Sequence, residues 1–411
     1  MASEWPLIRL GDYVESCLGK MLDAKKNKGI PQPYLGNSNV KWGRFELENL
    51  AEMKFEPHEE DRYGLLQGDL VVCEGGEPGR CAVWNGVSGM KVQKALHRIR
   101  PKSVLNNYYL FYWFCHAAKI GYLDQHFTGT TIKHLTGKAV AGLKVALPPL
   151  KTQIVIVKIL KRLDDRITLL RETNSTLEAI AQALFKSWFV EFDPVRAKAE
   201  GRLPDGIDAA TAALFPDAFE ETELGMVPRG WEVKKFGDFI DRQSVGKKFD
   251  QKTALAEGAV PILDQGKSGI IGFHNESAGV KASLENPVVV FANHTCYMRL
   301  ICFDFSAIQY VLPFIGKQVD TIWAYYATRD RIKFSEYKGH WPDFAIEKAV
   351  VPPEVLTKLY KDAVSPLVHR IRLNELQANT LSNLRDTLLP RLISGQLRIA
   401  DAEVELEKAI A

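Results

Sequence analysis

A long segment that occurs twice is the feature of this sequence that most constrains its fold. The run ALPPLKTQIVIVKILKRLDDRITLLRETNSTLEAIAQALFKSWF (146–189) lies over VVPPEVLTKLYKDAVSPLVHRIRLNELQANTLSNLRDTLLPRLI (350–393) without a gap. Pro148 and Pro149 fall on Pro352 and Pro353, and several leucines and one arginine match at the same offset. Chance does not explain a gapless match of this length, so the chain is read as one unit written twice.

A weaker repeat precedes each copy, where WPLIRLGDY (5–13) resembles WEVKKFGDF (231–239). Each unit then has short apolar runs punctuated by glycines, such as GDLVVCEGG (68–76), before a Pro-Pro stop and a long helix. These boundaries predict a first β-rich domain (1–150), a helical spacer (151–192), a linker (193–230), a second β-rich domain (231–350), a second spacer (351–396) and a tail (397–411).

The two spacers have the apolar heptad repeat of a coiled coil. The residues expected in the seam are Leu163, Ile167, Leu170, Asn174, Leu177 and Leu184 in the first copy and Leu367, Ile371, Asn374, Leu381 and Leu388 in the second. Pro194 follows the first helix, and Gly395 stands where a left-handed cap would end the second. Residues 154–190 alone would form a rod of roughly 55 Å.

An apolar heptad by itself indicates no more than a helical bundle core. Because each unit has only one seam, we expect the two seams of the chain to cover each other. The predicted fold is α+β: two α/β-type domains alternate with two long helices that pair as an intramolecular antiparallel coiled coil, in a pseudo-two-fold repeat. Asn174 and Asn374 either fix the register of this pair or point to solvent.

Composition excludes some classes of protein and leaves others open. A net charge of +3 and a pI near 8.3 are only mildly basic, so any affinity for DNA must come from local patches. No apolar run is long enough for a membrane span and the first residues do not resemble a signal peptide, so we expect a cytoplasmic protein. The six cysteines include no C-x-x-C pair and are interpreted as reduced core residues, without a metal.

Known catalytic motifs are missing from the sequence. It has no phosphate-binding G-x-x-x-x-G-K-[ST], no H-E-x-x-H and no G-x-G-x-x-G after a strand, and its Pro-Pro pairs lack the flanking residues of an adenine methyltransferase loop. The segment Gly75–Arg80 is interpreted as a turn rather than a phosphate cradle. The carboxylates 59–61 are interpreted as a solvated polar loop and Asp164-Asp165 as part of a packing helix. We therefore predict no catalytic residues.

At this point the residues resemble a known family. Gln153 after the first Pro-Pro, the heptad helix, the exit FVEFDPVRAK (189–198), and the stretches LFPD (214–217) and LGMVPRGW (224–231) are similar to the central part of type I restriction-modification specificity subunits. The resemblance covers the whole chain as an architecture. It extends to sequence detail only in the helical segments and the linker.

The resemblance implies a division of labour within a larger complex. Two target-recognition domains each read one half of a bipartite, asymmetric site on double-stranded DNA, and the paired helices set the spacing, about one helical turn or roughly 34 Å. The helices also dock two modification subunits, which carry S-adenosylmethionine and methylate adenine N6, and restriction subunits, which use ATP and Mg²⁺. This chain would hold no cofactor, would be a non-catalytic subunit, and would not contact a membrane.

Candidate DNA contacts are polar or basic residues on loops, because Asn, Gln, Arg, Lys, Ser and Thr read base edges and Lys and Arg hold phosphates. In the first domain they are Asn37, Ser38, Asn39, Lys41, Gln93, Lys94, His97, Arg98, Thr128, Gly129, Thr130, Thr131, Lys133 and His134. In the second domain they are Gln265, Lys267, His294, Arg299, Lys338 and His340. The Gly/Thr-rich set 128–134 is preferred, since the family has a similar loop before its Pro-Pro junction.

Two other functions remain open on the sequence alone. One is a non-enzymatic coiled-coil adaptor whose end domains bind proteins. The other is a single-chain DNA-modifying enzyme with an unrecognised site, against which the missing motifs argue. A specificity subunit should be retained on DNA, whereas a coiled-coil adaptor should not. A single-chain enzyme should be active without a partner, whereas a specificity subunit should not.

Overall fold

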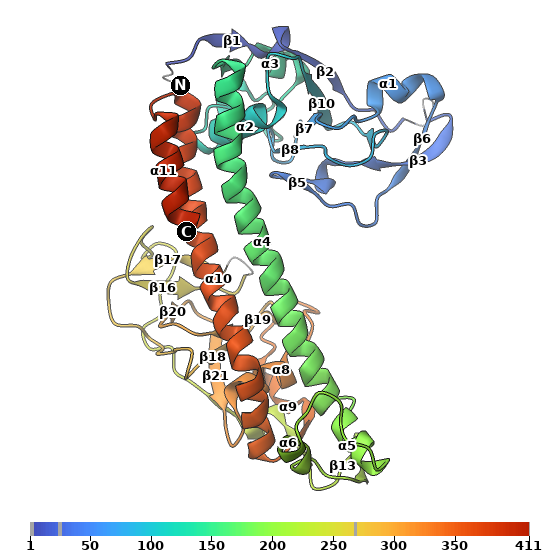
Figure 1. The fold of residues 1–411 in the computed structure, drawn as a ribbon, viewed down its shortest axis with the longest axis vertical. Helices are drawn as coiled ribbons and strands as arrows, with labels where there is room; N and C mark the ends of the chain where they lie inside the picture. Colours follow the sequence, from blue (N-terminus) through green and yellow to red (C-terminus); the bar gives the residue numbers. More distant parts are fainter. Residues whose placement is uncertain (1–3, 24–26, 267–268, 411) are drawn as a thin grey trace. The chain divides into compact units, whose positions relative to one another are not determined.

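The computed structural model describes residues 4–23, 27–266 and 269–410 (Figure 1). The chain divides into two compact units, Met1–Leu169 with Gln377–Ala411, and Leu170–Leu376. Each unit contains one mixed α/β domain and one half of each of two long helices.

The first domain is built on a four-stranded antiparallel sheet. Its strands, in the order β2-β10-β7-β8, are Val14–Leu18, Leu96–Pro101, Leu70–Cys73 and Cys81–Val83. All side chains of β7 and β8 are buried, as continuous short apolar runs predict. Helix α2 (Asn107–Lys119) packs on this sheet, and its first turn is capped by the Asn106 side chain, which accepts from Tyr109 N.

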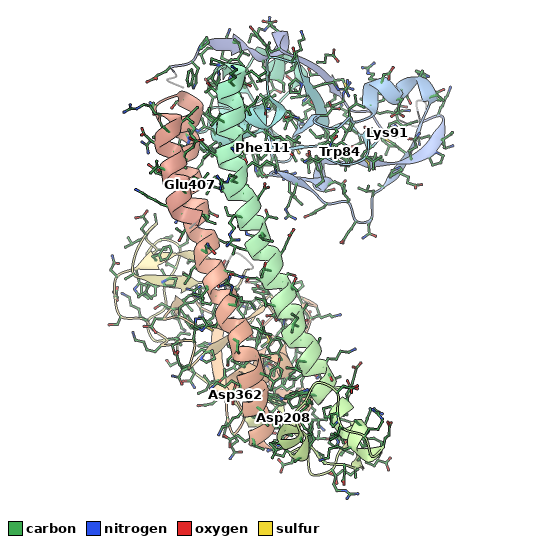
Figure 2. All side chains as sticks on the ribbon, viewed as in Figure 1. Trp84, Lys91, Phe111, Asp208, Asp362 and Glu407 are labelled. Atoms are coloured by element: carbon green, nitrogen blue, oxygen red, sulfur yellow. The ribbon has the colours of Figure 1, made fainter. Side chains whose placement is uncertain are left out.

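Smaller sheets complete the first domain. They are β6-β3-β9 (Glu52–Phe55, Ile30–Leu35, Lys91–Val92), β1-β11 (Leu7–Arg9, Lys144–Ala146) and β4-β5 (Val40–Lys41, Arg44–Phe45). Trp84, labelled in Figure 2, is buried between two of these sheets and meets the ring of Phe45 edge-on. Short helices α1 (Glu60–Tyr63) and α3 (Gly137–Gly142) and four 3₁₀ turns, η1 (Leu10–Asp12), η2 (Asn37–Asn39), η3 (Pro57–Glu59) and η4 (Asp124–His126), join the strands.

The second domain has the same sheets in the same order. The four-stranded sheet is β15-β21-β18-β19 (Ile240–Arg242, Val311–Gly316, Val288–Ala292, Met298–Ile301), the three-stranded sheet is β17-β16-β20 (Ile270–His274, Val260–Leu263, Ser306–Ala307), and the two-stranded sheet is β14-β22 (Glu232–Lys235, Lys348–Val351). Its helices are α7 (Phe236–Phe239), α8 (Thr321–Thr328) and α9 (Trp341–Ile346).

Strand directions match as well as strand order. In both three-stranded sheets the central strand pairs antiparallel with one neighbour and parallel with the other, as β3 does with β6 and β9 and β16 does with β17 and β20. The first domain differs by additions, η2-β4-β5 after β3 and η3-α1 after β6. The predicted internal repeat is therefore confirmed at the level of topology, well beyond the segments in which the sequence shows it.

The two long helices are α4 (Leu150–Phe189) and α10 (Glu354–Ser394). In the second unit Asn174 pairs with Asn374 while Ala181 meets Tyr360, so rising numbers on α4 face falling numbers on α10. The predicted α+β class and the antiparallel helix pair are both confirmed.

Both helix ends carry the residues that the sequence indicated. The chain leaves α4 through Phe192, whose φ is 57°, and enters α5 (Asp193–Ala199), with Pro194 in its first turn. Gly395 closes α10 with φ of 84°, in the left-handed region that glycine adopts without strain. A last helix, α11 (Ile399–Ile410), follows in the first unit.

The linker between α4 and the second domain folds into helix α5, helix α6 (Ala209–Ala213) and a hairpin of β12 (Phe219–Thr222) and β13 (Gly225–Pro228). The Lys198 ammonium donates to the carbonyl oxygens of Ala212 and Phe215 at the end of α6. A cation there complements the negative end of the helix dipole. No described helix is both long enough and apolar enough to cross a membrane.

Candidate nucleic-acid interface

Three loops of the first domain contact one another. Loop A (36–39) follows β3, loop B (74–80) follows β7, and loop C (128–135) precedes α3. The Arg80 guanidinium of loop B donates to the carbonyl oxygen of Asn37 in loop A at 3.0 Å. The Leu135 N–H of loop C donates to the carbonyl oxygen of Glu74 in loop B at 2.7 Å.

Loop B is the glycine-rich turn that the sequence analysis interpreted as structural only. A Cβ atom on Gly76 would lie 2.4 Å from the Asn37 side chain, and one on Gly75 would lie 3.2 Å from His134. Glycines at these positions therefore let loops A and C approach each other across loop B. Glu77 in the same turn accepts from Trp42 Nε1 at 2.7 Å and from Arg80 at 2.9 Å.

The second domain brings together the equivalent three loops. Loop A′ (264–266) follows β16, loop B′ (293–297) follows β18, and loop C′ (334–341) precedes and enters α9. The His294 N–H donates to Gln265 Oε1 at 3.0 Å, and the imidazole Nδ1 of His294 lies 2.8 Å from the Lys338 carbonyl oxygen. Gln265, His294 and Lys338, chosen from sequence in three separate places, thus lie in one cluster.

Backbone hydrogen bonds set the correspondence between the two clusters. Leu135 donates to Glu74 as His340 donates to Asn293, at 2.7 and 2.9 Å. Lys133 and Lys338 each lie two residues before the donor of this bond, whereas the helices that follow, α3 and α9, begin at Gly137 and Trp341 and are offset by one residue less.

A backbone outlier occurs beside each cluster. Glu74 N donates to the carbonyl oxygen of Ala95, and Asn293 N donates to that of Tyr310, at 2.8 and 2.9 Å. Ala95 and Tyr310 have φ of 86° and 70°, a region that costs residues with a Cβ atom about 1–3 kcal/mol. Such outliers are enriched at functional sites.

Most of the residues 128–134, the preferred candidates for DNA contact, lie exposed on loop C. Thr128 and His134 exchange two backbone hydrogen bonds of 2.8 Å, which close a hairpin with Gly129 at φ of 93°. Its exposed members are Thr128, Gly129, Thr130, Thr131 and Lys133, and His134 is half-buried.

The other exposed or half-buried choices of the first domain lie around loop A and the β9–β10 turn. Ser38 is exposed, whereas Asn37, Gln93 and Lys94 are half-buried. Asn39 uses its side chain within the loop, accepting from Gly36 N and donating to the Glu46 carbonyl oxygen. Lys41 is half-buried and pairs with Glu46 at 3.3 Å.

His97 and Arg98 were predicted to contact DNA, but both side chains are buried in this structure. Both lie on β10, which is flanked by β2 and β7, and their exposed fractions are 2% and 6%. His97 Nε2 contacts the Leu135 carbonyl oxygen at 2.8 Å, and burial lowers the pKa of its imidazole. Arg98 donates to the Asp61 carbonyl oxygen at 2.8 Å. The two side chains support loop C and helix α1.

Two candidate DNA-contact residues of the second domain are also largely buried. His340 is 1% exposed and lies 3.1 Å from the Glu336 carbonyl oxygen, so it shapes loop C′. Arg299 donates to the Gly269 carbonyl oxygen at 3.0 Å, and burial lowers the pKa of its guanidinium. Lys338 is exposed but pairs with Glu336 and Asp343. Lys267 lies outside the described residues.

The helix pair buries most of the expected seam, including an asparagine pair. Buried or half-buried members are Leu163, Ile167, Leu170, Leu177, Leu184, Leu367, Ile371, Leu381 and Leu388. Asn374, 1% exposed, donates to Asn174 Oδ1 at 2.8 Å, and Asn174 donates to the Ile371 carbonyl oxygen at 3.1 Å. Of the two alternatives for these asparagines, mutual pairing inside the seam is the one observed.

A tyrosine of each domain is anchored to a carboxylate of α4. In the first unit Tyr112 donates to Asp164 Oδ2 at 2.7 Å, and Arg385 of α10 pairs with Asp164 Oδ1 at 2.8 Å. In the second unit Tyr326 donates to Glu178 at 3.2 Å, and Arg329 pairs with the same carboxylate. Asp164 therefore joins a domain to both helices of its unit.

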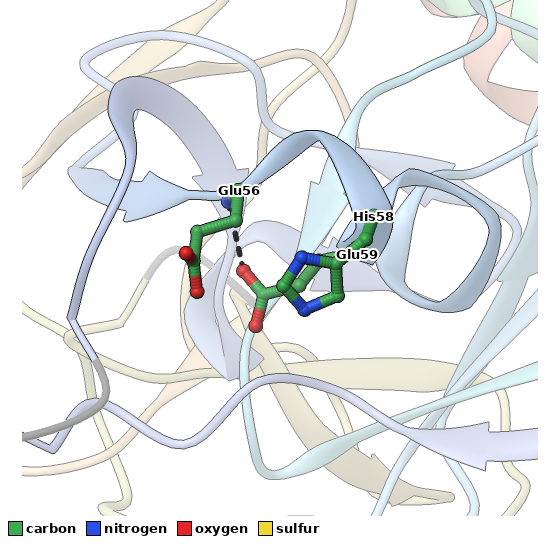
Figure 3. A group of neighbouring side chains, drawn as sticks. All are labelled: Glu56, His58 and Glu59. Carbon is green, nitrogen blue, oxygen red and sulfur yellow. Dashed lines mark hydrogen bonds between the residues drawn. The ribbon is translucent and has the colours of Figure 1, made fainter.

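Glu56, His58 and Glu59 form the group with metal-ligand geometry among the described residues (Figure 3). Glu59 already accepts from Glu56 N at 2.9 Å and pairs with the buried Lys20 at 2.5 Å. Burial opposes its ionisation, but these two donors lower the pKa of the carboxyl. The loop 59–61 is thus not a simple solvated face, because Glu60 also pairs with the buried Lys91, labelled in Figure 2.

The cysteines are free thiols, in agreement with the sequence interpretation. Cys73 and Cys81 are buried, and the other four are half-buried. Burial raises the pKa of the Cys73 and Cys302 thiols to about 11, which keeps them protonated at neutral pH.

Comparison with known proteins agrees with this architecture. Residues 2–179 match the model of the type I restriction modification DNA specificity domain. The MjaIX specificity subunit of Methanocaldococcus jannaschii is 25% identical, over 76% of this chain and 74% of the relative. The HindI specificity subunit of Haemophilus influenzae is 26% identical, over 65% of this chain and 72% of the relative.

A solved structure shows the same fold over nearly the whole chain. The crystal structure of the type I specificity subunit from M. genitalium superposes with a TM-score of 0.55 at 13% identity, and covers 95% of this chain and 96% of that one. Repeated domains, a paired-helix core, the matching domain model and relatives that span most of the sequence point the same way. Over most of its length the chain is similar to type I restriction-modification specificity subunits, and its residues 2–179 match the DNA specificity domain of that family.

Proposed function

We propose that this chain reads a bipartite, asymmetric site on double-stranded DNA, one half with each domain, for a type I restriction-modification complex. The observation that carries the proposal is the presence of the same three-loop cluster on the same scaffold twice, with different side chains in each copy. Because the two domains have the same sheets, each would present its loop cluster to DNA in the same way. Unequal loops give the two halves different sequences.

The chemistry of the loops suits DNA better than a protein partner. Loop C offers threonine hydroxyls and the exposed Lys133, which match base edges and phosphates. A small net charge of +3 is consistent with binding confined to such patches.

The helix pair would set the distance between half-sites and dock the partner subunits. Support comes from apolar side chains on its outer surface: in the second unit Ile180, Leu373 and Leu376 are 51%, 46% and 46% exposed. Apolar residues gathered on a helix surface are suited to burial in an interface. Two modification subunits with S-adenosylmethionine, and restriction subunits with ATP and Mg²⁺, would supply the adenine-N6 methylation and cleavage that this non-catalytic chain lacks. The complex would act in the cytoplasm.

Methylation mapping tests the proposal. The chain is expressed with its cognate modification subunit in a host without adenine methylation, and N6-methyladenine is located by single-molecule sequencing. The expected result is a split asymmetric motif that disappears when this chain is omitted. If the modification subunit is active with another specificity chain but yields no new motif with this one, the coiled-coil adaptor becomes the better account.

A further inference from the structure

Loops C and C′ each expose a large apolar side chain directly before a lysine. Ile132 precedes Lys133 and is 64% exposed, and Tyr337 precedes Lys338 and is 85% exposed. A single exposed apolar residue needs no explanation. Two such residues, one in each of the two loops and each followed by a lysine, indicate a shared use.

Local contacts hold the ring of Tyr337 and the backbone of Ile132. The Tyr337 ring stacks on the His294 imidazole with centroids 4.9 Å apart and an interplanar angle of 11°. His294 is in turn held edge-on by Tyr310 at 4.6 Å. Ile132 lies on the hairpin that needs Gly129, where a Cβ atom would come within 2.3 Å of the Ile132 carbonyl oxygen. Neither side chain needs a large rearrangement to present its apolar surface.

The thymine 5-methyl group is the apolar feature of a base edge in the major groove. Because an adenine is methylated in each half-site under the proposed function, each half-site contains at least one A·T pair and so a thymine. An apolar side chain on a loop that reaches the groove would meet that methyl group, and in loop C the neighbouring exposed Lys133 would hold the backbone.

We propose that Ile132 and Tyr337 are specificity-determining residues that each contact a thymine methyl group, Ile132 in the half-site read by the first domain and Tyr337 in the other. This inference rests on the proposed function. It assigns to both domains a common apolar contact, made by an aliphatic residue in one domain and by a His-backed aromatic ring in the other.

Motif mapping with single variants tests the assignment. Ile132→Ala should make one position of the first half degenerate and leave the second half unchanged, and Tyr337→Ala should do the reverse. Tyr337→Phe keeps the ring and should retain the motif. Val87→Ala, at a residue 87% exposed in the first domain but outside the three loops, is the matched control and should have no effect.

Thymine-to-deoxyuracil substitution tests the contact itself. With duplexes of the mapped site and the complex with the modification subunit, deoxyuracil at one thymine per half should weaken wild-type binding about fourfold, the value of one buried methyl group. Tyr337→Ala should abolish that difference in the second half and Ile132→Ala in the first. Equal binding of thymine and deoxyuracil by the wild type at every position would overturn the inference.

Failure of the proposed function and failure of this residue assignment would give different results. If the wild-type chain directs no split motif, the proposed function fails. If the wild type directs the motif but Ile132→Ala and Tyr337→Ala leave every position as stringent as before, only the assignment of these two residues fails.

Discussion

The two domains share a scaffold and differ in what the scaffold presents. Sheet order, strand direction and the bonds between loops B and C recur in the second domain. Loop C is a closed hairpin that exposes three threonines, Ile132 and Lys133, whereas loop C′ holds a stacked Tyr337–His294 pair and a lysine paired with two acids. The repeat therefore keeps the position of the loop cluster and changes its side chains, as the proposed asymmetric site would require.

The largest effect is expected in the shared scaffold. Trp323 of α8 is fully buried, and Tyr109 holds the corresponding place in α2. Trp323→Ala should lower the free energy of unfolding by about 3–5 kcal/mol, because a large core side chain is lost. Denaturant unfolding measures this change. Tyr337→Ala is the exposed control and should change stability by less than about 0.5 kcal/mol.

The anchors between domains and helices give the next largest effect. Asp164→Asn and Glu178→Gln keep the shape of each side chain but remove the charge that Arg385 or Arg329 pairs with. Each should cost about 1–3 kcal/mol, because a partly buried cation loses one of its two carboxylate partners. Equal costs would show that the two anchors are equivalent. A loss at Asp164 alone would show that the first domain depends more on its anchor.

The asparagine pair should show energetic coupling rather than two independent losses. Asn374→Leu alone leaves Asn174 without its side-chain partner and should destabilise the helix pair by about 1–2 kcal/mol. The double variant Asn174→Leu with Asn374→Leu should recover that loss or exceed wild-type stability. Additive losses in the double-mutant cycle would contradict a paired role.

The smallest effect separates the two lysines. Lys133 is exposed, and its ammonium lies 5.9 Å from the Phe127 ring centre. Because this ammonium is expected to contact a phosphate, Lys133→Ala should lower the slope of the logarithm of the binding constant against the logarithm of the salt concentration by about one. Lys338 already pairs with Glu336 and Asp343, so Lys338→Ala should change the slope by less. Binding titrations at several salt concentrations measure both slopes. A larger change for Lys338 would reverse the comparison.

Sequence predicted the helical elements well and the interface unevenly, for physical reasons. Heptads and caps are local, so Gly395 and Asn374 could be interpreted from nearby residues. His97 and Arg98 were misjudged because their burial depends on β2 and β7, which pair with β10 from distant parts of the chain. Loop B was passed over because its glycines matter only once loops A and C are packed against it. Ile132 and Tyr337, which we propose as specificity-determining residues, were not among the candidates because those were chosen as polar or basic residues on loops.

Domain exchange with methylation mapping tests the central claim most directly. Residues 231–351 are replaced by the equivalent segment of a specificity subunit with a different known motif, which leaves α4 and α10 in place. Single-molecule sequencing should then find the original first half joined to a new second half. A motif changed in both halves, or an unchanged motif, would contradict the account in which each domain reads one half of the site.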